Sequence, residues 1–174
     1  MRGGLRAVLA AALLSSLGAG ATRADDERLF VEASTRLSLA QLADFSGATL
    51  LAAAQASLPI VPWMLVDLRL GAEFPLRTGK MDADHGITLL ALPGLWGRFG
   101  DPEAWGYLRL GTGLAGQYGA GGWEAGWVVE AAGGFSVAPR DLLVYFGVEA
   151  AGMLGLAGPR VRSVGLGGFI GFPF

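Results

Sequence analysis

The segment Val161-Arg162-Ser163-Val164-Gly165-Leu166-Gly167-Gly168-Phe169-Ile170-Gly171-Phe172-Pro173-Phe174 ends the sequence and alternates in the size of its side chains. One face carries the bulky apolar residues Val164, Leu166, Ile170, Phe172 and Phe174, and the other carries Ser163, Gly165, Gly167 and Gly171. This division is typical of a strand with lipid on its outer face and a crowded lumen on its inner face. The segment therefore predicts a transmembrane β-strand.

The same period of two recurs in seven further segments, each roughly ten residues or longer, as a membrane-crossing strand requires. Together the eight segments cover residues 28–39, 48–58, 63–74, 86–99, 104–115, 123–137, 142–153 and 161–174. The fourth is the weakest, because both of its faces are apolar and Pro93 lies inside it. Since proline donates no hydrogen bond to a ladder, we expect a bulge or an early end at Pro93.

One stretch competes with this interpretation. Residues 47–66 contain no charged side chain, and that length alone is typical of a transmembrane helix. Pro59 and Pro62 interrupt the stretch, however, and proline breaks the interior of a helix. Because the neighbouring segments alternate clearly, we favour a strand here as well.

The composition agrees with a membrane barrel. The chain has 174 residues, enough for one domain, and only 16% of them are charged, against about a quarter in soluble domains. The absence of cysteine excludes disulfides and thiolate metal sites. The apolar faces are too bulky for the interior of an eight-stranded barrel, so we expect them to point outward. Aromatic residues near strand ends are expected to form interfacial girdles: Trp63, Trp96, Trp105, Phe135, Phe172 and Phe174.

The N-terminus predicts a cleaved helical signal peptide over residues 1–24, leaving the barrel as residues 25–174. Arg2 and Arg6 precede the apolar run 7–17, which is too short for a comfortable membrane anchor. Small residues then allow cleavage after Ala24 or after Ala21. Cleavage after Ala24 removes three of the 13 basic residues and none of the 15 acidic ones, so the remaining chain has a net charge of −5. We therefore expect no nucleic-acid partner.

Eight strands place both termini on one side, which is the periplasmic side in bacterial barrels. The predicted periplasmic turns are short and contain proline, at residues 59–62, 100–103 and 138–141. The predicted outer loops cover residues 40–47, 75–85, 116–122 and 155–160.

With its signal sequence, its eight alternating segments and the end Gly168-Phe169-Ile170-Gly171-Phe172-Pro173-Phe174, the chain resembles the eight-stranded outer-membrane barrels of the OmpA/OmpX and opacity-protein type. The resemblance implies an all-β, antiparallel, up-and-down transmembrane β-barrel in a bacterial outer membrane, surrounded by lipid and lipopolysaccharide. It also implies that Ile170, Phe172 and Phe174 form a C-terminal signal for the barrel-assembly machinery, although Pro173 departs from the usual alternation. Members of this family include adhesins, structural anchors, narrow pores and lipid-modifying enzymes, so the resemblance assigns no activity.

Nine charged residues fall on the inward faces of the predicted strands. Charges removed from bulk water need partners, so we predict that Arg36, Arg69 and Arg109 bridge acids on adjacent strands. The result is a charge-plugged lumen in a monomeric barrel with a structural or surface-interaction role; a narrow, low-conductance ion path is the alternative. The nine residues are Glu32, Arg36, Asp67, Arg69, Glu73, Arg109, Glu124, Glu130 and Glu149.

Two further constellations carry weaker chemistry. Asp82-Ala83-Asp84-His85 is the only local cluster of metal-type ligands, and its spacing matches no defined site, so we predict no metal and no cofactor. A lipid A or phospholipid-modifying enzyme has to use His85, the only histidine, with Ser163 as its only available partner. The chain also lacks the asparagine of the phospholipase barrels. We therefore expect no catalytic residues.

Overall fold

The computed structural model describes residues 29–42, 45–76, 86–119, 122–140, 142–158 and 161–174. They form eight strands, namely β1 (Phe30–Leu42), β2 (Phe45–Val61), β3 (Met64–Pro75), β4 (Thr88–Asp101), β5 (Ala104–Gly119), β6 (Gly122–Val137), β7 (Tyr145–Ala157) and β8 (Val161–Pro173). Within these residues, no helix has the length and apolar character needed to cross a membrane. The predicted signal peptide lies outside the described residues.

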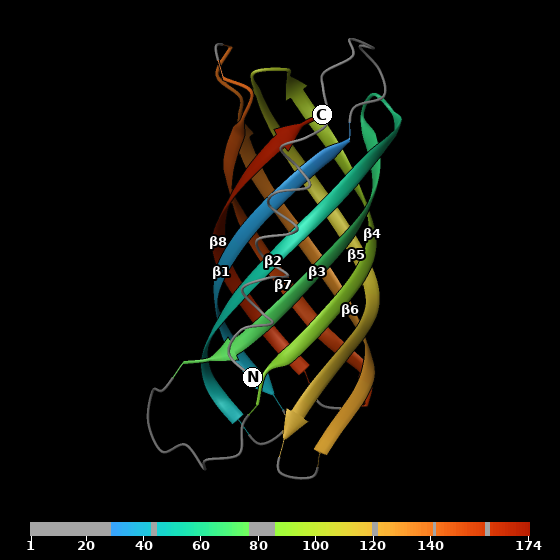
Figure 1. Cartoon of the computed structure of the whole chain (residues 1–174), viewed down its shortest axis with the longest axis vertical. Helices are drawn as coiled ribbons and strands as arrows, with labels where there is room; N and C mark the ends of the chain where they lie inside the picture. The colour runs from blue at the N-terminus through green and yellow to red at the C-terminus, as the bar shows by residue number, and fades with distance from the viewer. Residues whose placement is uncertain (1–28, 43–44, 77–85, 120–121, 141, 159–160) are drawn as a thin grey trace.

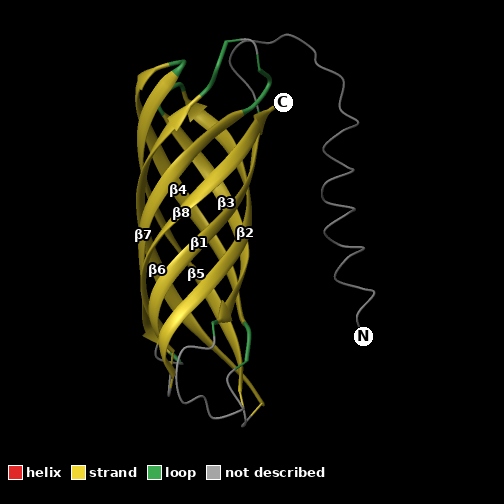
Figure 2. Ribbon diagram, turned by 90° about the vertical axis from the view of Figure 1, so that its left-hand side faces the viewer, coloured by secondary structure: helices red, strands yellow, loops and turns green. Residues whose placement is uncertain are grey.

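The strands close into a single barrel, in which each pairs antiparallel with the next and β8 returns to β1 (Figures 1 and 2). The closing seam runs from the pair Phe30↔Pro173 to the pair Leu42↔Val161. Beyond it, the backbone N–H of Phe174 donates a 2.8 Å hydrogen bond to the carbonyl of Leu29. The predicted all-β, eight-stranded antiparallel up-and-down barrel is confirmed, and β2 runs through the stretch that competed as a helix.

Side chains alternate between the two sides of the barrel wall along every strand, because successive residues of a strand point to opposite faces. On β1, Arg36 and Ser38 are buried inside, whereas Leu37 and Leu39 are exposed outside. On β3, Asp67 and Arg69 are likewise buried inside, whereas Leu68 is exposed outside. The predicted assignment of faces therefore holds for these strands, and charged residues are brought together in the lumen.

Several strands begin or end at other residues than the sequence predicts. At one end of the barrel, which we call the turn end, Pro62-Trp63 and Pro102-Glu103 form tight turns. At the other, which we call the far end, β5 continues to Gly119 and β6 begins at Gly122, so the predicted outer loop 116–122 is mostly strand. Backbone pairing continues there although the side chains no longer alternate clearly. Conversely, β7 begins at Tyr145 rather than at residue 142.

The expected bulge or early end at Pro93 is wrong. Strand β4 passes through Pro93 in unchanged register, since the pairs Ala91↔Leu114 and Gly94↔Gly111 on either side are in step. The ladder with β5 is interrupted only at Leu92 and Pro93, while both residues still pair with β3. A proline without a donor interrupts one side of a ladder and leaves the strand in place.

The barrel core has an apolar layer near each end, which corrects the expectation that the bulky apolar side chains point outward. The aromatic layer lies near the turn end and contains Leu65, Trp96, Trp105, Tyr107, Tyr145 and Phe169. The aliphatic layer lies toward the far end and contains Ala40, Leu51, Leu90, Leu92, Ala115, Val128, Met153 and Val161. Trp96 and Trp105 are only 4% and 6% exposed, so the prediction that they belong to an interfacial girdle is wrong.

Glycines make room for the aromatic layer. A Cβ atom built on Gly171 would lie 2.2 Å from the ring of Tyr145, and one on Gly147 would lie 2.5 Å from the ring of Phe169. Tyr145 and Phe169 in turn pack edge to face, with ring centroids 6.3 Å apart. The small residues that the sequence shows on the inner faces therefore do not leave an open channel, because rings from neighbouring strands occupy their space.

Candidate functional site

Between the aromatic and aliphatic layers lies a set of six buried ionic side chains, which we call the ionic layer. It contains three arginines and three acids, each on an inward position of its strand. Taking charges out of water is costly unless each finds close opposite charges, so the geometry of this layer determines whether it is tolerated. Its members are Arg36 on β1, Asp67 and Arg69 on β3, Arg109 on β5, Glu130 on β6 and Glu149 on β7.

Glu130 is the centre of the ionic layer and is fully buried. Its Oε1 atom accepts hydrogen bonds from Arg69 Nη1 at 2.9 Å and from Arg109 Nη1 at 2.8 Å. Its Oε2 atom accepts one from Arg36 Nη2 at 2.8 Å. A single carboxylate therefore contacts all three arginines, and charge-assisted bonds of this length are among the stronger hydrogen bonds in proteins.

Arg69 joins Glu130 to Glu149. Its Nη1 and Nη2 atoms donate to the two oxygens of Glu149 at 3.0 and 2.7 Å, the fork-to-fork arrangement that a guanidinium favours with a carboxylate. Its Nε atom donates to Gln55 Oε1 at 2.8 Å. The hydroxyl of Tyr107 donates to Glu149 Oε2 at 2.9 Å and so connects the ionic layer to the aromatic layer.

Arg109 forms an ion pair with Asp67 and also donates a hydrogen bond to the backbone beside Pro93, where the ladder is interrupted. Its Nη2 atom lies 2.6 Å from Asp67 Oδ1, and its Nε atom lies 3.0 Å from Asp67 Oδ2. The same Nη2 atom donates to the carbonyl of Leu92 at 2.9 Å. Because Leu92 is one of the two β4 residues without a ladder partner on β5, the guanidinium supplies a hydrogen bond to a carbonyl beside the gap.

The remaining three predicted lumen acids lie apart from the arginines. Glu32 accepts a 2.7 Å hydrogen bond from the hydroxyl of Tyr145, and Glu73 accepts one of 2.5 Å from Thr49 Oγ1. Neither forms an ion pair within the described residues. Glu124 is exposed near the far end of β6 and has no ion pair with a described residue. The ionic layer proper thus has three positive and three negative side chains.

The prediction that the arginines bridge acids on adjacent strands is largely wrong. Only Arg109 and Glu130 belong to neighbouring strands, β5 and β6. The Arg36–Glu130 pair joins β1 to β6, and the Arg69–Glu149 pair joins β3 to β7, so both cross the lumen. Because the barrel is narrow, long side chains from opposite walls meet at its axis. The arginines therefore pair mainly with acids across the lumen and not with acids on the next strand.

Sequence reasoning did not identify four polar side chains that complete this arrangement. Three of them donate a hydrogen bond to a predicted lumen acid: Thr49 to Glu73, Tyr107 to Glu149 and Tyr145 to Glu32. The fourth, Gln55, accepts one from Arg69. All four lie on inward positions, and a buried hydroxyl or amide usually has a partner. Their inward position was available in the sequence, but the identity of the partner was not.

The other candidate residues are placed as follows. On β8, Ile170 is exposed on the outer face, and the rings of Phe172 and Phe174 lie 6.5 Å apart at the turn end. Ser163 faces the lumen and is 8% exposed, and His85, its only possible catalytic partner, lies outside the described residues. No cluster of three metal-type ligands exists among the residues that the structure describes, and Asp82 and Asp84 lie outside those residues.

Solved structures with a similar fold are small barrels. Neisserial surface protein A has a TM-score of 0.69 to this chain at 14% identity, over 84% of this chain and 97% of that one. The N-terminal β-barrel domain of Pseudomonas aeruginosa OprF has a TM-score of 0.57 at 17% identity, over 86% and 98%. Ail, the attachment invasion locus protein of Yersinia pestis, solved with the heparin analogue sucrose octasulfate, has a TM-score of 0.52 at 13% identity, over 86% and 99%. The fold is that of the eight-stranded outer-membrane barrels. No protein-family model and no curated protein matches the sequence.

Neutralising Arg69 is expected to destabilise the barrel. In Arg69→Gln, the buried carboxylate of Glu149 loses the guanidinium that donates to both of its oxygens. Removing one member of a buried ion pair costs about 3 kcal/mol. The urea midpoint of the protein in detergent micelles should fall accordingly. Arg140→Gln is the matched control, because Arg140 pairs with Glu103 on the exposed surface, where an ion pair contributes little. Equal midpoints for Arg69→Gln and wild type would contradict the role of the ionic layer.

Proposed function

We propose that this protein is a small integral outer-membrane barrel with a plugged lumen and a structural or surface-interaction role. The outer face supports membrane insertion, because leucine, valine and aromatic side chains cover it and large exposed apolar surfaces mark contact with another phase. A 13-residue strand tilted by about 45° rises roughly 30 Å, which equals the thickness of a bilayer's hydrocarbon core.

The distribution of charge on the outer face supports the same conclusion. Among the described strand residues, only two charged side chains occupy outward positions. Asp101 is the last residue of β4 at the turn end, and Arg162 is the second residue of β8 at the far end. The band between them is free of charge, as expected of the part that contacts acyl chains, where charged side chains are destabilising.

The observation that carries the plugged-lumen proposal is the sequence of three layers inside the barrel. Leu92 of the aliphatic layer, Glu130 of the ionic layer and Tyr145 of the aromatic layer are each no more than 2% exposed. Ion passage would require breaking the contacts of Glu130 with three arginines and displacing packed side chains on both sides of it. We therefore favour a closed scaffold over a narrow pore.

The orientation and partners follow from this proposal. The turn end faces the periplasm, together with the C-terminus and the start of β1, and the far end faces outward. Outer-membrane lipid and lipopolysaccharide surround a monomeric barrel, and Ile170, Phe172 and Phe174 are read by the barrel-assembly machinery during insertion. A lipid-modifying activity is disfavoured, because Ser163 points into the lumen and away from the acyl chains.

Single-channel recording on the refolded protein tests this function. With every described layer of the lumen packed, wild-type protein in a planar bilayer should give no discrete conductance steps. Refolding is first verified by β-type circular dichroism and by a change in electrophoretic mobility after heating. Defined, reproducible steps from refolded wild-type protein would overturn the plugged-scaffold proposal and support the low-conductance pore.

A further inference from the structure

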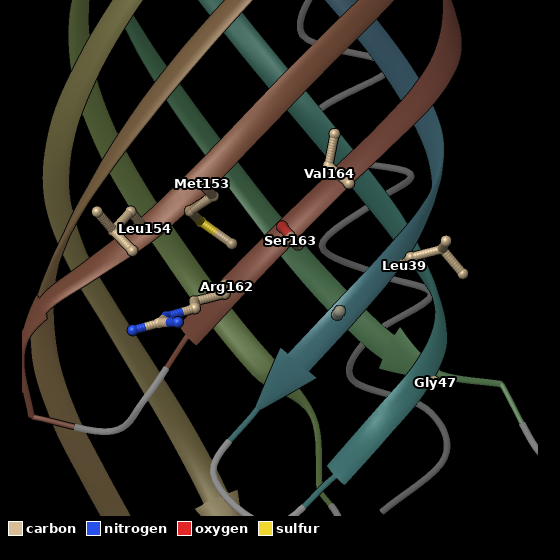
Figure 3. Close-up of a pocket in the computed structure, with 8 residues that line it drawn as sticks. Leu39, Gly47, Met153, Leu154, Arg162, Ser163 and Val164 are labelled. Atoms are coloured by element: carbon tan, nitrogen blue, oxygen red, sulfur yellow. The ribbon is translucent and has the colours of Figure 1, made fainter.

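A groove of about 490 Å³ lies near the far end of the barrel and is lined by residues of β7, β8, β1 and β2 (Figure 3). This volume greatly exceeds the roughly 10–15 Å³ of accessible space that holds a single water molecule. In Figure 3, Arg162 lies closest to the end of β8, Val164 lies farther along the same strand and Leu39 lies on β1. The residues lining the groove are Leu39, Ala40, Gly47, Met153, Leu154, Arg162, Ser163 and Val164.

The groove belongs to the outer surface of the barrel. Leu39 and Val164 point outward and are 70% and 63% exposed, and Leu154 points the same way. Four members of the lining occupy inward positions, and three of them, Ala40, Met153 and Ser163, have buried side chains. An open groove of this size on the lumen side would leave these three side chains exposed. The groove is therefore an apolar surface feature in the region that the proposed function assigns to lipid.

Arg162 gives this groove a positive charge. It is exposed and occupies an outward position, one residue before Ser163 and two before Val164. It forms no ion pair with any residue in the described part of the chain, whereas the three arginines of the ionic layer and Arg140 are all paired. No other outward position of the described strands at this end is charged. An apolar groove with one cation at its outer edge complements an amphiphile that has an anionic headgroup.

We propose that this groove binds a phosphorylated, acylated lipid of the outer leaflet, the lipid A part of lipopolysaccharide, with Arg162 contacting the phosphate and Leu39, Leu154 and Val164 contacting an acyl chain. A guanidinium matches a phosphate through paired N–H donors, which makes arginine well suited to this contact. The inference rests on the proposed function, because it needs the far end of the barrel to lie at the outer leaflet.

Titration of lipid A onto the purified protein in detergent micelles, followed by native mass spectrometry, tests the proposal. Arg162→Gln is expected to weaken binding by about fivefold, the effect of one basic residue near an anionic lipid surface. Arg140→Gln, which removes an exposed arginine at the turn end, should leave binding unchanged. Equal binding by wild type and Arg162→Gln, or an equal loss in both variants, would overturn the assignment.

Further arms separate the phosphate from the acyl chain. Dephosphorylated lipid A should bind wild type and Arg162→Gln equally, and Val164→Asn should weaken the binding of phosphorylated lipid A by placing an amide in the groove. Inorganic phosphate should not compete, since it lacks the acyl chain; full competition would overturn a lipid site. Circular dichroism of the same samples tests the proposed function separately. A wild-type protein without β-structure in micelles refutes the barrel itself, whereas an intact barrel with unchanged lipid A binding in Arg162→Gln refutes only the groove.

Discussion

Replacing Glu130 by glutamine should cause one of the largest losses of stability available in this protein. Glu130 accepts hydrogen bonds from Arg36, Arg69 and Arg109 and is fully buried. An amide at this position presents two N–H donors to a ring of three guanidinium groups and leaves an excess positive charge inside the barrel. Since removing one partner of a buried pair costs about 3–5 kcal/mol, we expect a loss at or above the upper end of that range.

The chain supplies a matched control for this experiment. Glu124 lies on the same strand and on an inward position, but it is exposed. Glu124→Gln should change the free energy of unfolding by no more than about 0.5 kcal/mol. Both variants are measured by urea unfolding in micelles, followed through tryptophan fluorescence and heat-dependent mobility. If the double variant Glu130→Gln/Arg36→Gln regains part of the lost stability, charge imbalance is the cause. Additive losses would point to packing alone.

Gly113→Val is expected to prevent the barrel from forming. Gly113 lies on an inward position of β5, and a Cβ atom built there would lie 2.1 Å from the backbone carbonyl oxygen of Ala91 on β4. A clash with a flexible side chain can be relieved by a rotamer change. This oxygen, however, belongs to the backbone of β4, at the last residue paired with β5 before the gap at Leu92 and Pro93. Overpacking a well-packed site usually costs about 1–3 kcal/mol, and a collision with backbone that cannot yield costs more.

Gly152→Val is the control for this second prediction. Gly152 lies on β7, and the nearest atom to a Cβ built there is the carbonyl oxygen of Ser163 at 3.8 Å, an ordinary contact distance. Its side chain would point outward toward lipid, where valine is well accommodated. We expect this variant to refold with a wild-type yield, measured as the fraction with heat-dependent mobility. A normal yield for Gly113→Val would contradict the close approach of β5 to the Ala91 carbonyl.

The strands and their faces were predictable because both depend on a local pattern. A period of two separates Arg36 from Leu37 and Asp67 from Leu68 without knowledge of any partner. The C-terminal strand was predicted in the same way, down to its alternation of glycine with large residues. Strand limits were less accurate at the far end, where β5 and β6 continue after the alternation fades.

The contacts across the lumen were not predictable, since they depend on the height of each residue in the closed barrel. Strand tilt brings Arg36 on β1 level with Glu130 on β6, although no local pattern relates these positions. The same cause explains two errors. Glu124 shares the inward face with Glu130 but lies at the end of the barrel, and Trp96 is near a strand end but points inward. To predict which lumen residues meet, the position of each residue along its strand and the direction it faces have to be combined with the stagger between strands around the whole barrel.

The seam between β1 and β8 limits how this barrel can be modified. A Cβ atom added at Gly165 would lie 2.2 Å from Ser38 Oγ, and one at Gly167 would lie 2.2 Å from the carbonyl oxygen of Thr35. Side-chain volume added at these two glycines therefore collides with the first strand before it reaches the axis. Between Val161 and Phe169, its own contributions to the two apolar layers, the last strand leaves no room for a new side chain, so engineering that aims to widen or functionalise this part of the interior has to start from the opposite wall.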